Sequence, residues 1–286
     1  MVTVLPTAVT SWCTENGWGP VVSSEALTGG MVSRTERLTT SDNRSLILKS
    51  NSDAPADIFA REAEGLGALT VSGGPRIPTV FLVGSDLLLL EDLQPTPPQP
   101  HFWEEFGQRL AALHLQTGTQ YGFSRDNYCG VTPQPNPWTE SGCEFFAEYR
   151  LRYQARLAHD KGHLSTEDLR RAETLCERLP DLVPPQSPAL IHGDLWSGNA
   201  LCGPNGEPAL IDPAAHFGWA EAELGMTLLF GGFPRAFYDA YLHTYPLAPG
   251  WRERVDIYNL YHLLNHLHVF GQSYLGRVQS VLKHYE

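Results

Sequence analysis

Residues 190–200 read LIHGDLWSGNA, and this stretch decides between two interpretations of the chain. Two apolar residues run into His192, Gly193 and Asp194, and Asn199 follows Asp194 by five residues. A polar turn would account for the residue types alone. The spacing, however, is that of the kinase catalytic loop, H-x-D-x-x-x-x-N. In such a loop the aspartate orients the acceptor hydroxyl and the asparagine reaches a metal ion on the phosphates, so we predict a phosphoryl-transfer site.

A further acidic residue lies downstream of this loop. Asp212 follows Asn199 by thirteen residues and ends PALID (208–212), one of two short strand-like runs, the other being ALIHG (189–193). Kinases bind Mg²⁺ through one or two carboxylates together with phosphate oxygens. We therefore expect Asn199 and Asp212 to hold magnesium.

The first ninety residues contain candidates for the phosphate-binding part of such a site. Lys49 lies near the end of the β-rich run SLILKSN (45–51), and Glu62 follows in IFAREAEGLGAL (58–69), which has a helical period. A strand lysine paired with a helix glutamate is how kinases hold the α- and β-phosphates of ATP. Taken alone, Lys49 and Glu62 are consistent with two solvated surface charges, and Glu64 is an alternative partner for the lysine. We prefer Glu62 because its spacing to the later leucines puts it on the face expected to point inward.

A glycine pair precedes this lysine. Gly29 and Gly30 lie inside EALTGGMVSRTERLTT (25–40), which predicts two strands joined by a tight turn. Glycines there let backbone N–H groups approach phosphates closely, although an ordinary hairpin turn uses the same residues. The pair alone is weak evidence. Followed by the lysine, the glutamate and the loop residues in kinase order, it indicates an ATP-binding site.

The organisation of the chain favours a bilobal, protein-kinase-like fold of the α+β class. The beginning of the chain is typical of strands with one helix, and the proline-rich QPTPPQP (94–100) excludes a helix or inner strand at that point. Ser165 opens a capping box, and Pro180 is expected to end the helix that follows it. We expect a small β-rich, ATP-binding lobe at 1–92 and a larger helical lobe at 93–286 for catalysis and sugar-acceptor binding. The helical periods of this second lobe lie at 101–118, 143–162, 165–179 and 256–271.

The bulk composition excludes several classes of function. The chain has 286 residues, 42% of them hydrophobic, and a formal net charge of −12 at pH 7. Such an acidic surface repels a phosphate backbone, so we expect no nucleic-acid partner. The five cysteines form no CxxC pair, and no apolar run approaches the roughly 18 residues that a membrane helix needs. Because the N-terminus also lacks a basic signal segment, we expect a cytoplasmic protein with no membrane partner; the oligomeric state stays open.

The chain contains the motifs HGDLWSGN (192–199), IDPA (211–214), EAELGM (221–226), YGFSRDNYCGVTPQPNPW (121–138) and LYHLLNHLHVFGQSYLG (260–276). Together they resemble the fructosamine kinase family, which is similar in fold to aminoglycoside phosphotransferases and protein kinases. The resemblance implies phosphorylation, dependent on ATP and Mg²⁺, of a sugar hydroxyl on a ketoamine such as a ribulosamine or fructosamine adduct, free or on a protein. The acceptor is usually the 3-hydroxyl, and decomposition of the phosphorylated adduct would repair the glycated amine.

Carried over to this sequence, the resemblance implies a role for each candidate residue. Asp194 would be the catalytic base. Asn199 and Asp212 would bind magnesium, and Lys49 and Glu62 would hold the phosphates. Gly29 and Gly30 would belong to the phosphate loop, and the backbone of Glu91 and Leu93 would bind adenine.

Polar residues of the C-terminal helix are candidates for the acceptor pocket. His262, Asn265 and His266 share one helix face because they are spaced i, i+3 and i+4. The HxxxH spacing also suits zinc, but the sequence shows no third ligand nearby and lacks the HExxH glutamate. A buried polar network is the plainer interpretation. The resemblance favours a pocket in which this face binds the sugar hydroxyls and Trp196 stacks on the sugar.

Two rival functions stay open at this point. One is an aminoglycoside or other small-molecule kinase, because the fold alone does not separate such enzymes. The other is a nucleotide-binding pseudokinase sensor, which would be expected to have lost at least one catalytic position, whereas all are filled here. One departure from the family pattern is Trp219-Ala220, where a His-Arg pair is expected. It would alter specificity if it touched the substrate.

Overall fold

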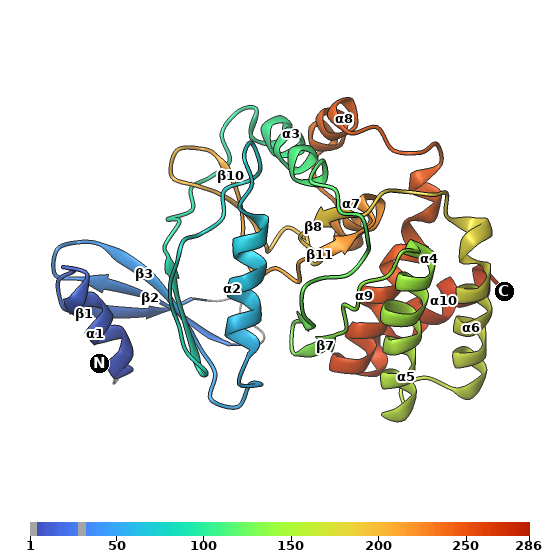
Figure 1. The fold of residues 1–286 in the computed structure, drawn as a ribbon, viewed down its shortest axis with the longest axis horizontal. Helices are drawn as coiled ribbons and strands as arrows, with labels where there is room; N and C mark the ends of the chain where they lie inside the picture. Colours follow the sequence, from blue (N-terminus) through green and yellow to red (C-terminus); the bar gives the residue numbers. More distant parts are fainter. Residues whose placement is uncertain (1–4, 28–32) are drawn as a thin grey trace.

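The computed structural model describes residues 5–27 and 33–286, which form a small β-rich part and a larger helical part (Figure 1). Within the described residues, the small part has a five-stranded antiparallel sheet in the order β1-β2-β3-β5-β4. Its strands are β1 (Val21–Ala26), β2 (Arg34–Thr40), β3 (Ser45–Ser50), β4 (Val80–Val83) and β5 (Leu87–Glu91). The two strands expected within 25–40 are present as β1 and β2, although β1 begins earlier, at Val21.

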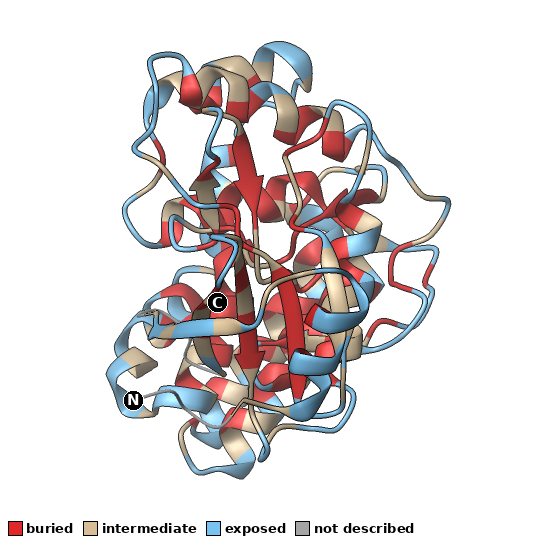
Figure 2. Cartoon of the chain, turned by 90° about the vertical axis from the view of Figure 1, so that its left-hand side faces the viewer, coloured by how far each residue is buried: buried red, intermediate tan, exposed pale blue. Residues whose placement is uncertain are grey.

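The sheet is covered on both faces, which explains the run of four leucines in strand β5. Leu87 and Leu89 pack in a cluster with helix α1 (Thr7–Glu15), while Leu88 and Leu90 pack against helix α2 (Ile58–Leu69). Alternate residues of a strand point to opposite faces, so four consecutive buried leucines serve two clusters. Figure 2 shows buried strand arrows at the centre of the molecule.

Helix α1 corrects the expectation of only one helix in this part. Among its residues only Val9 and Cys13 are buried, and their spacing of four gives too short an apolar stripe to stand out in the sequence. Helix α2 has the range expected from its periodicity, 58–69.

Helices dominate the larger part. Helix α9 (Val255–Phe270) lies at its centre, with ten buried residues, and packs against α7 (Ala220–Leu229) and α5 (Tyr153–Asp160). The other helices are α3 (Phe102–His114), α4 (Gly142–Phe146), α6 (Thr166–Leu182), α8 (Arg235–Thr244) and α10 (Leu275–His284), with short 3₁₀ turns at η2 (Trp251–Arg254) and η3 (Gln272–Tyr274).

Two helix predictions need correction. The helix expected over 143–162 is interrupted by a π-helical turn, η1 (Ala147–Arg152), between α4 and α5. Helix α6 does not end at Pro180 but runs to Leu182. Pro180 lies in the last turn of α6, where a missing N–H donor costs at most one hydrogen bond. The N-cap prediction is confirmed, since the Ser165 hydroxyl accepts a hydrogen bond from the backbone N–H of Asp168 at 3.1 Å.

Three pairs of short antiparallel strands lie in the segments that connect these helices. Strand β8 (Ala189–Ile191) pairs with β11 (His216–Gly218), β9 (Ala200–Cys202) with β10 (Pro208–Leu210), and β6 (Asn127–Cys129) with β7 (Thr132–Gln134). The sequence predicted only β8 and β10, because three-residue strands are too short for a recognisable period.

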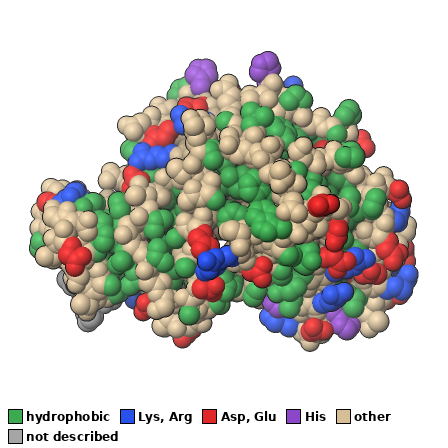
Figure 3. Space-filling view, in the orientation of Figure 1, with side chains coloured by type: hydrophobic (Ala, Val, Ile, Leu, Met, Phe, Trp, Pro, Cys, Tyr) green, Lys and Arg blue, Asp and Glu red, His purple; other side chains and the backbone are tan. Residues whose placement is uncertain are grey.

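The connection between the two parts is irregular, as the prolines predict. Residues 92–99 form neither helix nor strand. We keep 1–92 and 93–286 as a proposed division into lobes. Acidic and basic side chains are interspersed on the face shown in Figure 3. Within the part of the chain that the structure describes, no helix combines the length and apolar character needed to cross a bilayer.

Candidate active site

A cavity of about 620 Å³ brings together residues from both parts of the chain. Lys49 and Glu62 reach it from β3 and α2, and Asp194, Asn199 and Asp212 reach it from the loops after β8 and β10. Trp196, Asn265 and His266 also line it. The cavity therefore collects most of the sequence-predicted site residues, although these are spread over more than two hundred positions.

Lys49 is the centre of a buried ion-pair cluster. Its Nζ lies 2.5 Å from Glu62 Oε1 and 2.5 Å from Asp212 Oδ1. Burial opposes the lysine charge, but the carboxylates of Asp212 and Glu62 outweigh it and raise the pKa of Lys49. Burial raises the pKa of Glu62. The rival partner Glu64 is exposed and binds Arg61 instead, so the choice of Glu62 as ion-pair partner agrees with the structure.

The loop 192–199 needs a glycine at position 193. Gly193 has φ +83°, and a Cβ there would lie 2.2 Å from the carbonyl oxygen of Ala214. Only glycine adopts this conformation at such a close approach without strain. The tight turn points Asp194 toward the cavity immediately after β8 ends.

A buried carboxylate on α7 fixes the same turn. Glu223 accepts hydrogen bonds from the backbone N–H groups of His192 and of Gly193, the second at 3.0 Å, and lies 3.4 Å from His114 Nε2. Burial opposes the charge, but His114 and His192 outweigh it and lower the pKa of Glu223. Sequence reasoning missed this role. The available signal was an acidic residue inside the apolar run of EAELGM, but its partners lie thirty residues away.

Asp194 and Asn199 contact each other across the loop. Asn199 Nδ2 donates to the backbone oxygen of Asp194 at 2.8 Å and to Asp194 Oδ2 at 3.3 Å. Because the amide nitrogen is the donor in both contacts, the amide oxygen is the atom that could ligate a cation. Burial, followed by the charges of Asp212 and Glu223, raises the pKa of Asp194 to about 7.

Asp212 has an unusual backbone. Its φ is +56°, in the left-handed region that few non-glycine residues adopt. Such conformations cluster at functional sites, where the surrounding structure imposes them. Here Asp212 lies two residues after the end of β10, and the backbone N–H of the intervening Ile211 donates to the carbonyl oxygen of Asn199 at 3.1 Å. This bond ties the two predicted metal-binding residues together.

The predicted acceptor residues divide between two environments. Asn265 and His266 line the large cavity, whereas His262 lies deeper and lines a small cavity of about 30 Å³. Asn265 Oδ1 accepts a hydrogen bond from Thr132 at 2.7 Å, so its side chain also secures the β6–β7 turn. Burial lowers the pKa of His262 to about 3 and that of His266 to about 4, so both rings are neutral at pH 7.

Aromatic rings accompany His266 at the cavity wall. Its ring centroid lies 5.5 Å from that of Phe230 and 5.0 Å from that of Tyr274. The ring of Trp196 lies 5.8 Å from Phe230. Sequence reasoning selected Trp196 and His266 but missed Phe230 and Tyr274, because these aromatics lie on other segments.

Some predicted residues lie apart from the cavity. Glu91 and Leu93 are not among the residues that line it. The Glu91 carboxylate binds Arg76, and its backbone N–H donates to the carbonyl oxygen of Thr79 at 2.9 Å, so that N–H is not free for adenine. Leu93 is buried.

The Trp219-Ala220 pair also lies apart from the cavity. Gly29 and Gly30 lie outside the described residues. Trp219 is buried, with ring centroids 5.1 Å from Phe146 and 5.7 Å from Tyr258. This departure from the family pattern therefore belongs to the core of the helical part.

Comparison with known proteins gives a consistent result. The sequence profile of fructosamine kinases matches residues 8–285. A protein of Synechocystis sp. assigned as a ketoamine kinase is 40% identical over 263 residues, covering 90% of this chain and 88% of the relative. A protein-ribulosamine 3-kinase of Oryza sativa subsp. japonica is 32% identical, covering 97% of this chain and 83% of the relative. A crystal structure from Thermobifida fusca assigned as a fructosamine-3-kinase superposes with a TM-score of 0.88 at 35% identity, covering 98% and 99% of the two chains.

Proposed function

The chain belongs to the fructosamine kinase family, and from that premise we propose how its cleft phosphorylates a ketoamine. The family consists of phosphotransferases with an alcohol group as acceptor, and the activity of this chain is phosphorylation of the sugar hydroxyl of a ketosamine, with a nucleotide as phosphate donor. The observation that carries the residue-level proposal is the convergence of Lys49, Glu62, Asp194, Asn199 and Asp212 on one cavity.

Asp194 is the proposed base. The sugar hydroxyl oxygen, at O3 in this proposal, attacks the γ-phosphorus of ATP, the bond to the bridging oxygen breaks and ADP leaves, while the hydroxyl proton passes to the Asp194 carboxylate. The Asn199 contacts hold this carboxylate in position. A base with a pKa near neutrality suits proton transfer at physiological pH.

Asn199 and Asp212 are the proposed magnesium ligands. Both offer hard oxygen atoms at the cavity, which is the donor chemistry that Mg²⁺ prefers. When bound, the ion would neutralise charge on the β- and γ-phosphates. The bond between Ile211 and Asn199 keeps the two ligand-bearing loops in register.

Lys49 is the proposed phosphate anchor, oriented by Glu62. Its present contact with Asp212 would be exchanged for phosphate oxygens on nucleotide binding, while the contact with Glu62 would persist. For adenine, the carbonyl oxygen of Glu91 and the backbone of Leu93 are the proposed contacts. Gly29 and Gly30 are proposed for the phosphate loop.

The acceptor is proposed to lie between α9 and Trp196. Asn265, His266 and Trp196 line the cavity beside Asp194, and His262 lies next to the Asp194 carboxylate. In this proposal the polar side chains bind sugar hydroxyls and the indole stacks on the sugar. The product would decompose to release the amine, which is a deglycation reaction.

The test is ATP consumption with Mg²⁺ against ribuloselysine, fructoselysine, kanamycin and no acceptor, with the wild type and Asp194→Asn. We expect turnover with a ketoamine and loss of turnover, with nucleotide binding retained, in the variant. Turnover with kanamycin but with no ketoamine would identify the enzyme as an aminoglycoside kinase. Nucleotide binding without turnover on any acceptor would instead favour a sensor.

A further inference from the structure

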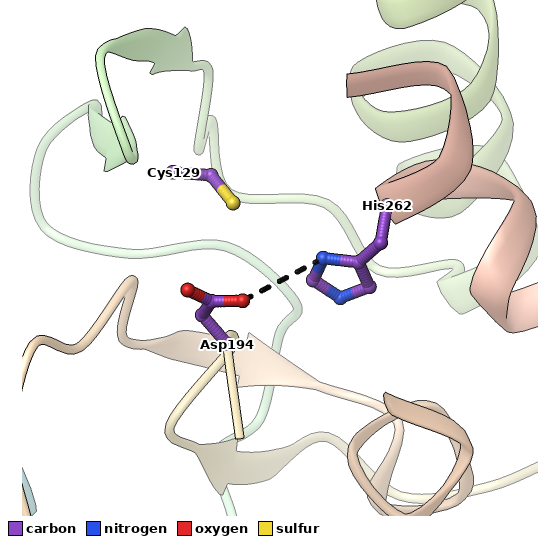
Figure 4. Close-up of side chains that lie close together, drawn as sticks. All are labelled: Cys129, Asp194 and His262. Atoms are coloured by element: carbon purple, nitrogen blue, oxygen red, sulfur yellow. Dashed lines mark ion pairs between the residues drawn. The ribbon is translucent and has the colours of Figure 1, made fainter. Parts of the chain in front are cut away.

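Three potential metal ligands from distant parts of the chain meet beneath the cleft. Cys129 ends β6, Asp194 lies in the loop after β8, and His262 lies on α9. One ligand atom from each, the thiol sulfur, a carboxylate oxygen and a ring nitrogen, all lie within 4.8 Å of one another. Figure 4 shows the three side chains directed toward a common point.

His262 is the unusual member of this cluster. The residue is 6% exposed, yet its ring makes no hydrogen bond to any other residue that the structure describes. Its Nδ1 points at Asp194 Oδ1 but lies 3.9 Å away, beyond hydrogen-bond distance (Figure 4). A neutral imidazole carries one nitrogen lone pair. No described residue donates a hydrogen bond to the His262 ring, so this lone pair is available to a cation.

Cys129 completes a donor set that magnesium does not favour. The residue is 3% exposed, and Asn265 Nδ2 lies 3.4 Å from its sulfur, which fixes the side chain on the side of the cleft. Mg²⁺ prefers an octahedral shell of oxygen atoms. A sulfur, a nitrogen and an oxygen together suit Zn²⁺ or another thiophilic divalent cation, with a fourth position left for water or substrate.

We propose that Cys129, Asp194 and His262 form a three-ligand site for Zn²⁺ or a similar thiophilic divalent cation, and that occupation of this site inhibits the kinase. Bond lengths to zinc imply separations of about 3.3–3.7 Å between ligand atoms, so the side chains must close by up to about 1.5 Å. Binding displaces the thiol proton of Cys129 to solvent, and the sulfur–metal bond replaces the sulfur–hydrogen bond. A cation held there occupies the carboxylate that is proposed to accept the substrate proton.

Metal binding is tested without any assay of turnover. The full-length chain, free of nucleotide and magnesium, is titrated with Co²⁺, which gives a near-ultraviolet charge-transfer band when a thiolate coordinates it. We expect one equivalent of Co²⁺ to produce the band in the wild type, Cys129→Ala to abolish it, and His262→Gln to weaken binding at least tenfold.

Cys143→Ala is the matched control, since Cys143 is half-buried in α4 and lies outside the cluster. It should keep the band. Absence of the band in the wild type, or an equal band in Cys129→Ala, would overturn the site. If circular dichroism shows that Cys129→Ala is unfolded, the test rests on His262→Gln alone. An unchanged affinity of that variant for Co²⁺ also overturns the site.

Inhibition is tested separately and rests on the proposed function. The assay contains excess Mg²⁺, ATP and a ketoamine that the wild type phosphorylates. Zn²⁺ should inhibit the wild type and Cys143→Ala equally, and half-inhibition of Cys129→Ala should require at least tenfold more Zn²⁺. Equal sensitivity of all three would show that inhibition arises elsewhere. A cobalt band that depends on Cys129, in a chain that phosphorylates no ketoamine, would keep the metal site and reject the proposed function.

Discussion

The cleft has a proposed nucleotide side and a proposed acceptor side. On the nucleotide side, Lys49 already makes two ion pairs, each at 2.5 Å. On the acceptor side, His262 lies 3.9 Å from Asp194 and has no hydrogen-bond partner among the described residues. The first side pairs one cation with two carboxylates, while the second includes a neutral ring without a hydrogen bond. Nucleotide binding must therefore exchange existing contacts of Lys49, whereas binding of an acceptor or a metal can add contacts to His262.

This difference has an energetic consequence. A buried charge that loses its partner costs several kcal/mol unless a new partner replaces it, so the lysine cluster should tolerate substitution poorly. A neutral polar group costs only about 1–3 kcal/mol when it is left unpaired. Changes on the nucleotide side should therefore have larger effects than changes among the neutral groups on the acceptor side.

The largest effect is expected at Asp212, which belongs to the lysine cluster and is a proposed magnesium ligand. Asp212→Asn should lower kcat with a ketoamine on the order of 10³-fold, because it removes a metal ligand and a lysine partner together. Steady-state ATP consumption measures this. The control Asp86→Asn changes an exposed residue in the β4–β5 turn and should leave kcat unchanged. A loss below tenfold in Asp212→Asn would remove Asp212 from the proposed site.

Lys49→Met should lower kcat/KM for ATP by roughly 10²-fold, because the β3 lysine anchors the phosphates. It also leaves Glu62 and Asp212 without the cation between them. Lys283→Met, at an exposed position of α10, is the control. An unchanged KM for ATP, with unchanged kcat, would mean that the lysine cluster serves folding alone.

Glu223→Gln tests the support beneath the acceptor side. The amide would present an N–H₂ group to backbone N–H donors of His192 and Gly193, so we expect a loss of about 2 kcal/mol in unfolding free energy, roughly 30-fold in the equilibrium constant. Urea denaturation measures the loss. Glu177→Gln, on the exposed side of α6, should stay within about 0.5 kcal/mol of the wild type. Equal stability of the two variants would argue against a carboxylate acceptor at this turn.

Asn265→Ala should have the smallest effect. We expect the KM for the ketoamine to rise about tenfold while the KM for ATP stays constant, because one polar contact with the sugar is lost. Asn205→Ala, in the exposed β9–β10 turn, controls for general changes in activity. If both KM values rise together, the Thr132–Asn265 hydrogen bond acts on the whole cleft and the acceptor assignment is wrong.

Local patterns in the sequence predicted much of the fold. Helix α2 and strand β3 follow from apolar periods that are continuous in the chain. Helix α1 was missed because its two buried residues give too weak a periodic pattern. The effect of Pro180 was overestimated, because a proline in the last turn of a helix removes at most one hydrogen bond. The short strands β6, β7, β9 and β11 lie below the length at which a period can be recognised.

The sequence by itself predicted the proposed chemistry of the cleft, since the spacing of Asp194, Asn199 and Asp212 is determined within one local segment. Only the tertiary structure decided which groups meet across segments: Asp212 with Lys49, Glu223 with the loop, and Cys129 with His262. The physical reason is that spacing constrains neighbours along a helix or loop. Contacts between residues separated by thirty to one hundred and sixty positions depend on how helices and sheet pack together.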